Sequence, residues 1–142
     1  MQKKDFFTSQ LRKELQNNTL SPLELMFLAQ KECADRGFDF SNPNQVIGKL
    51  EEEVAEVREA YDDGHPRADL LQEIGDVFFS LVNLCRHLDV DPAEILQGNF
   101  DKFLQRCEFI ENQLADSNKD WSDVTDPEIR TMWRAAKVTP EK

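Results

Sequence analysis

The chain has 142 residues, and its 28 acidic against 17 basic side chains give a formal net charge of −11. This length fits one domain with its own hydrophobic core, and so acidic a chain is a poor partner for nucleic acid or an anionic membrane, because both attract basic surfaces. No apolar run approaches the roughly 18 residues of a membrane span, and the charged N-terminus does not resemble a signal peptide. We therefore expect a cytoplasmic protein with reduced cysteines at Cys33, Cys85 and Cys107.

Helix start and stop signals follow one another along the chain, and no segment longer than a few residues alternates as a strand would. A weak N-terminal helix lies within residues 1–20, and Ser21-Pro22 begins a second helix that ends near Gly37. The other predicted helices cover about 45–62, 68–88, 92–114 and 126–138, with a loop at 116–125. The sequence thus predicts an all-α single domain over residues 1–142, a bundle of five to six helices.

The third predicted helix carries a glutamate on its apolar face. Glu53 falls between Leu50 and Val57 in helical phase, and Glu56 follows one turn later. The remaining glutamates of this helix fit its solvated side, although Glu52 borders the apolar face. A carboxylate in this position needs a partner or a function.

The fourth predicted helix is apolar nearly all round, apart from a single polar stripe. The stripe repeats at helical spacing and consists of Glu73, Asp76, Ser80, Asn83 and His87. An all-round apolar helix is typical of a bundle interior. Two carboxylates there need a cation against them, because an uncompensated buried charge costs more than the stability of a whole domain.

Each of these two helices offers two carboxylates three residues apart, and antiparallel packing can bring the pairs Glu53/Glu56 and Glu73/Asp76 together. Four carboxylates form an all-oxygen site, which suits Mg²⁺, with Mn²⁺ as a possible substitute. A di-iron site would instead use Glu-x-x-His pairs. His87 lies about 16 Å along the helix from Asp76, at 1.5 Å per residue, which is out of reach.

Basic and amide side chains complement this acidic site. Asn99, Lys102 and Arg106 recur on one stripe of the fifth predicted helix, and Lys49 lies one turn before Glu53. Magnesium in proteins is commonly shared between a few carboxylates and substrate phosphates, while lysine and arginine bind the remaining phosphate oxygens. The pattern therefore indicates a polyphosphate ligand.

Several residues leave a structural and a functional interpretation open. Asn83 fits either a satisfied polar position in the core or a substrate contact. Trp121 and Trp133 either pack in the core or stack on a base. Taken alone, Glu53 and Glu56 would often be surface ion-pair residues.

Four segments carry a more specific pattern: KLEEEVAE at 49–56, EIGDVFFSLVNLCRHL at 73–88, NFDKFLQR at 99–106 and MWRAAK at 132–137. Together they resemble the MazG-like branch of the all-α nucleoside triphosphate pyrophosphohydrolases. The resemblance implies a core four-helix arrangement completed by a second chain, as a homodimer or a dimer of dimers. It implies that Mg²⁺ is held by Glu53, Glu56, Glu73 and Asp76, and that nucleotide is contacted by Lys49, Lys102, Arg106 and Trp133.

The implied activity is hydrolysis of a nucleoside triphosphate to the monophosphate and pyrophosphate, which clears unwanted nucleotides. Glu52 or Glu53 is the candidate base for the attacking water, and Lys102 and Arg106 would stabilise charge on the departing pyrophosphate. Two alternatives stay open. One is an enzyme specialised for dUTP, dCTP or a phosphoribosyl nucleotide, and the other is a non-catalytic acidic module for helical dimerisation.

Overall fold

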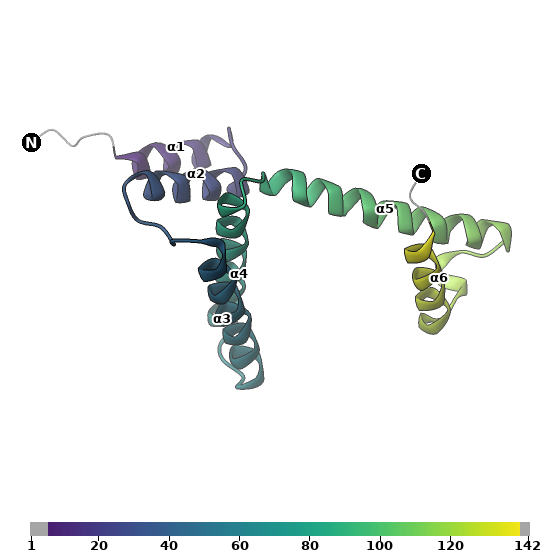
Figure 1. Cartoon of the computed structure of the whole chain (residues 1–142). Helices are drawn as coiled ribbons and strands as arrows, with labels where there is room; N and C mark the ends of the chain where they lie inside the picture. Colours follow the sequence, from purple (N-terminus) through teal and green to yellow (C-terminus); the bar gives the residue numbers. More distant parts are fainter. Residues whose placement is uncertain (1–5, 140–142) are drawn as a thin grey trace, which may run out of the picture. The chain divides into compact units, whose positions relative to one another are not determined.

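A computed structural model of the chain describes residues 6–139, which form six α-helices, one short 3₁₀ helix and no strand (Figure 1). The helices are α1 (Phe7–Asn17), α2 (Pro22–Asp35), α3 (Pro43–Asp62), α4 (Arg67–His87), α5 (Pro92–Asp116), η1 (Trp121–Asp123) and α6 (Asp126–Val138). The all-α prediction is confirmed. Residues 1–5 of the stretch 1–20, where the weak N-terminal helix is expected, lie outside the described residues.

Side-chain caps set the beginnings of α2 and α3. Ser21 accepts a hydrogen bond from the backbone N–H of Glu24 at 3.2 Å, and the Glu24 carboxylate accepts one from the N–H of Ser21 at 2.7 Å. At α3, the Asn42 side chain accepts from the N–H of Gln45 at 3.1 Å, and Pro43 occupies the first turn. Proline suits that position because its missing N–H would have no helical partner there. The cap explains why α3 begins two residues before the predicted start.

The central feature of the N-terminal part is the antiparallel pair α3 and α4. A short turn joins the two helices, and Gly64 adopts φ +65° in it, a left-handed conformation that glycine reaches without steric cost. α3 and α4 pack along each other, α2 packs on α4, and α1 packs on α2 (Figure 1). This pairing places the two acidic motifs on neighbouring helices, as the sequence predicts.

The chain divides into two compact units, residues 1–93 and residues 94–142. Within the second unit, the later part of α5 is covered, since Ile110 and Leu114 are buried, as is Ala136 on α6. Phe103 of α5 and Trp133 of α6 also contact each other, with ring centroids 5.7 Å apart. The single domain expected over the whole chain stays a prediction.

Within the first unit, α3 and α4 leave lines of apolar side chains exposed. On α4 these recur at helical spacing and are Leu71, Ile74, Phe78 and Leu81. On α3 they recur every seven residues and are Ile47, Val54 and Tyr61. The sequence pattern predicts a fully buried α4, and one chain buries only part of that surface. Among the described residues, no helix combines the length and apolar character needed to cross a membrane.

Candidate metal centre and substrate-binding residues

Three of the four predicted metal ligands lie together. Glu53 of α3 and Glu73 and Asp76 of α4 each place a carboxylate oxygen so that all three atoms are within 4.8 Å of one another. Residues 73 and 76 share one face of α4 because they are one helical turn apart, and the packing of α3 against α4 brings Glu53 to that face. The cluster thus follows from one local spacing on α4 and the packing of one helix pair.

Glu53 is the buried member of this cluster, with only 6% of its surface exposed. Its Oε1 forms an ion pair with the Lys49 ammonium at 2.8 Å, and its Oε2 is buried without a hydrogen-bond partner. The lysine lowers the pKa of Glu53 and keeps the carboxyl group ionised, against the opposing effect of burial. A charged oxygen that lacks a partner next to two more carboxylates is the environment that a bound cation would complete.

The fourth predicted ligand, Glu56, is exposed and is not one of the three clustered residues. Its carboxyl group nevertheless lies in their field, since Glu53 first and Glu73 to a smaller degree raise the pKa of Glu56. This mutual repulsion is what a divalent cation would relieve. Its role as a ligand stays a prediction.

Glu52, one of the two candidate bases, differs from Glu53 in its surroundings. Its side chain is 67% exposed and its Oε2 lies 3.3 Å from the ammonium of Lys49. Lys49 therefore bridges the two candidate bases. Glu53 and then Glu52 raise the pKa of Lys49, so the ammonium is held in its charged form.

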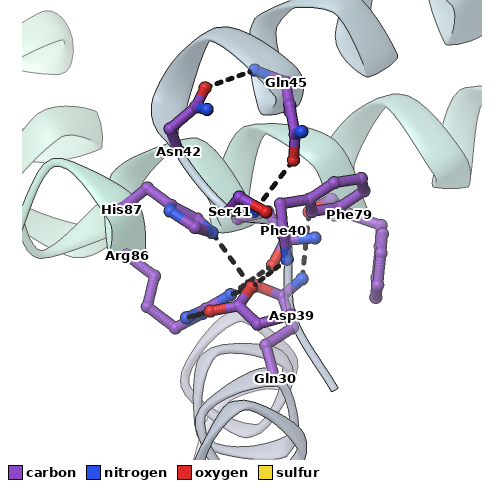
Figure 2. A network of polar contacts seen from close by, with 10 residues as sticks. Gln30, Asp39, Phe40, Ser41, Asn42, Gln45, Phe79, Arg86 and His87 are labelled. Atoms are coloured by element: carbon purple, nitrogen blue, oxygen red, sulfur yellow. Dashed lines mark hydrogen bonds and ion pairs between the residues drawn. The ribbon is translucent and has the colours of Figure 1, made fainter. Parts of the chain in front are cut away.

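A second polar network, which the sequence analysis missed, lies where α4 ends (Figure 2). Arg86 donates two hydrogen bonds to Asp39, at 2.8 Å and 2.5 Å, and His87 Nε2 lies 2.9 Å from the same carboxylate. Arg86 chiefly, with His87, holds the pKa of Asp39 well below its usual range. The network fastens the loop before α3 to the end of α4.

Asn83, a predicted substrate contact, belongs to this network in the structure. It is buried, and its side-chain oxygen accepts a hydrogen bond from Arg86 at 3.1 Å. Nearby, Gln30 of α2 donates from Nε2 to the backbone carbonyl of Phe79 at 3.0 Å, while its Oε1 is buried without a partner (Figure 2). The Asn83 oxygen is therefore already engaged by protein, and its contact with substrate stays a prediction.

In the second unit, a cationic and aromatic cluster contains two predicted nucleotide contacts. The Arg106 guanidinium lies 5.4 Å from the ring centroid of Trp133, and the ammonium of Lys137 lies 6.0 Å from it. Such cation–π contacts hold a charged group against an aromatic face. Of the other predicted contacts here, Lys102 is half-buried and Asn99 is exposed.

Comparison with known proteins gives a consistent result. A family model described as the MazG nucleotide pyrophosphohydrolase domain matches residues 41–110. The nucleoside triphosphate pyrophosphohydrolase/pyrophosphatase MazG of Thermotoga maritima is 35% identical over 121 residues, covering 84% of this chain and 46% of the relative. The nucleoside triphosphate pyrophosphohydrolase of Escherichia coli K12 is 34% identical over 109 residues, covering 76% of this chain and 41% of the relative.

The chain thus spans less than half the length of these two curated relatives. The family match begins before the Asn42 cap of α3, includes both carboxylate pairs and continues past Arg106. Those are the segments that build the carboxylate cluster and part of the cationic cluster. By this match, residues 41–110 of the chain form a MazG nucleotide pyrophosphohydrolase domain.

Proposed function

We propose that this protein hydrolyses nucleoside triphosphates to the nucleoside monophosphate and pyrophosphate, with Mg²⁺ as its cation and Mn²⁺ as a possible substitute. The observation that carries the proposal is the unpartnered, buried Oε2 of Glu53 beside Glu73 and Asp76. Without a cation, a buried carboxylate with one unpaired oxygen next to two other carboxylates would destabilise the folded protein. The family match supports the choice of substrate.

The protein's own residues divide the work by charge. The predicted cation ligands are Glu53, Glu56, Glu73 and Asp76, and the bound ion would neutralise phosphate oxygens. Lys49, Lys102 and Arg106 bind the remaining oxygens, and Arg106 is held for this by the face of Trp133. Asn83 and Asn99 contribute polar contacts to substrate. Glu52 or Glu53 accepts the proton of the attacking water.

The proposed partner in solution is a second copy of the same chain, in a homodimer or a dimer of dimers. The exposed apolar lines of α3 and α4 support this, because a second α3–α4 pair laid against them would form the expected four-helix core. Apolar side chains at such regular spacing are typical of an interface between helices. We place the protein in the cytoplasm, as its cysteines Cys33, Cys85 and Cys107 are free thiols.

The test is pyrophosphate release in excess Mg²⁺ from a panel of ribo- and deoxynucleoside triphosphates that also includes a phosphoribosyl nucleotide, with Glu73→Gln and Asp76→Asn as variants. Each variant should lose about a hundred-fold or more in turnover, because each removes one charge that holds the cation. Glu59→Gln is the matched control, since Glu59 is exposed on α3. Near-normal turnover in both site variants would refute the proposal, and activity confined to dUTP, dCTP or a phosphoribosyl nucleotide would replace it with the specialised enzyme.

A further inference from the structure

Lys49 occupies an unusual position for a residue that is expected to bind substrate. Its ammonium lies 2.8 Å from Glu53 Oε1 and 3.3 Å from Glu52 Oε2, so it is committed to the protein's own carboxylates. In the described residues it is the one basic side chain in an ion pair with any member of the Glu53, Glu73 and Asp76 cluster. A single ammonium therefore offsets part of the negative charge of three clustered carboxylates.

An ammonium and a divalent cation compete for this place. Both are attracted by the same carboxylates, and both would bind the carboxylate oxygens of Glu53. At the short distances of the cluster, the two positive charges also repel each other. The ammonium leaves Glu53 Oε2 unsatisfied, so its fit to the site is incomplete. The Lys49 side chain is 40% exposed, whereas the Glu53 side chain is 7% exposed, so the lysine is the partner that can move into solvent.

We propose that Lys49 acts as the resident counter-ion of the cluster in the metal-free protein, and that it withdraws from Glu53 when a divalent cation binds. Exposed Glu52 gives the ammonium a second carboxylate to stay beside as it leaves. Released from Glu53, Lys49 is free to contact the phosphates of the nucleotide, and this last step rests on the proposed function. The lysine thus keeps the acidic site intact while it is empty and serves the substrate once it is filled.

The competing interpretation is that Lys49 is a fixed brace that holds the Glu53 carboxylate in position for the cation. The two roles predict opposite signs for one variant. Without a competing ammonium, Lys49→Met should bind a divalent cation more tightly. Without a brace, the same variant should bind it more weakly.

The experiment measures Mn²⁺ affinity in the absence of nucleotide, from the electron paramagnetic resonance signal of free Mn²⁺, for the wild type and Lys49→Met. We expect about five-fold tighter binding in the variant, because a unit positive charge has been removed from a few ångströms away. Arg58→Met is the matched control, since it removes a positive charge from an exposed ion pair with Asp62 on the same helix. The control should change affinity by less than about two-fold.

Unchanged or weaker Mn²⁺ binding by Lys49→Met overturns the proposal. Lys49→Gln repeats the measurement with a polar side chain, and helix content by circular dichroism shows whether each variant is folded. If the wild type binds Mn²⁺ and the variants do not bind it more tightly, the counter-ion role fails while the metal site stands. If the folded wild type does not bind Mn²⁺ at all, the metal site and the counter-ion role fail together.

Discussion

At the scale of single residues, the proposed metal site depends on how Glu53 is buried. The helical phase of α3 predicts that Glu53 lies on the apolar face, and the structure shows it buried, with one oxygen bound by Lys49 and the other without a partner. The spacing of Glu73 and Asp76 on α4 likewise follows from sequence alone. Which oxygen atoms lack a partner depends on the packing of two helices, so no sequence pattern could show it.

Replacing Glu53 should separate metal binding from folding. We expect Glu53→Gln to weaken Mn²⁺ binding by about ten-fold or more, because a neutral amide is a poorer ligand and adds no charge to the cluster. The free energy of unfolding should stay within about 1 kcal/mol of the wild type, since the abandoned Lys49 is exposed enough to be solvated. Isothermal titration calorimetry and urea unfolding measure the two quantities, and wild-type affinity in a folded variant would contradict the assignment.

The Asp39, Arg86 and His87 network shows the limit of reading single residues from sequence. The alternation of Phe38 and Phe40 in the loop before α3 predicts that both are apolar anchors, yet Phe38 is 80% exposed. Asp39, which lies between them, makes the polar contacts that attach the loop to Arg86 and His87. Asp39 and Arg86 are 47 positions apart. A contact over that distance has no period by which a sequence pattern could reveal it.

At the scale of elements, the same network should stabilise the attachment of the α3 loop to α4. We expect Asp39→Asn to lower the free energy of unfolding at neutral pH by about 1–2 kcal/mol, because Arg86 loses its ionised hydrogen-bond acceptor. Solvent screens part of the attraction between Arg86 and Asp39, which keeps the loss small. Asp35→Asn is the control, since its ion pair with Lys31 is exposed. Equal stability of Asp39→Asn and the wild type would contradict the account.

The pH dependence of that difference has a definite sign. Since Arg86 lowers the folded-state pKa of Asp39, the carboxylate stabilises the folded protein above its unfolded pKa of about 3.9. This contribution is lost as the pH falls below about 4, because protons then bind the unfolded state first. Urea unfolding at a series of pH values should show the wild type losing its advantage over Asp39→Asn in that range, and an advantage that grows there would be inconsistent with the ion pair.

The cap of α3 gives a second prediction at this scale. Asn42→Ala should cost about 1 kcal/mol, because it removes the side-chain acceptor for the N–H of Gln45. Asn44→Ala, two residues later and exposed in the first turn of α3, is the matched control and should change the free energy of unfolding by less than about 0.5 kcal/mol, because exposed substitutions away from caps have small effects. Thermal unfolding of both variants measures the contrast, and equal effects would mean that the cap does not set the start of α3.

At the scale of the whole molecule, the sequence predicts the helices well and their partners incompletely. Proline and capping residues mark the helix starts, so the predicted and observed bounds agree to within a few residues. The apolar character of α4 predicts complete burial, and one chain leaves Phe78 61% exposed. The periodicity of apolar residues predicts that a helix face is buried, but it does not indicate whether the surface that covers this face belongs to the same chain.

The exposed apolar lines lead to a prediction about assembly. The wild type should sediment at twice the 16.5 kDa mass of the chain or at a larger multiple, whereas Phe78→Glu should shift toward the monomer, because a charge would be buried in the interface. Gln72→Glu adds the same charge at an exposed polar position of α4 and should leave the mass unchanged. A wild type that is monomeric at all concentrations would contradict the proposed homodimer.

The most direct test of the central claim is to identify the products. They are observed by ³¹P nuclear magnetic resonance while the wild type turns over a nucleoside triphosphate with Mg²⁺. The account predicts the signals of pyrophosphate and nucleoside monophosphate, and it predicts that a chelator which removes the metal stops their growth. Release of inorganic phosphate with a diphosphate, turnover that continues in the chelator, or no turnover of any nucleotide in the panel would contradict it.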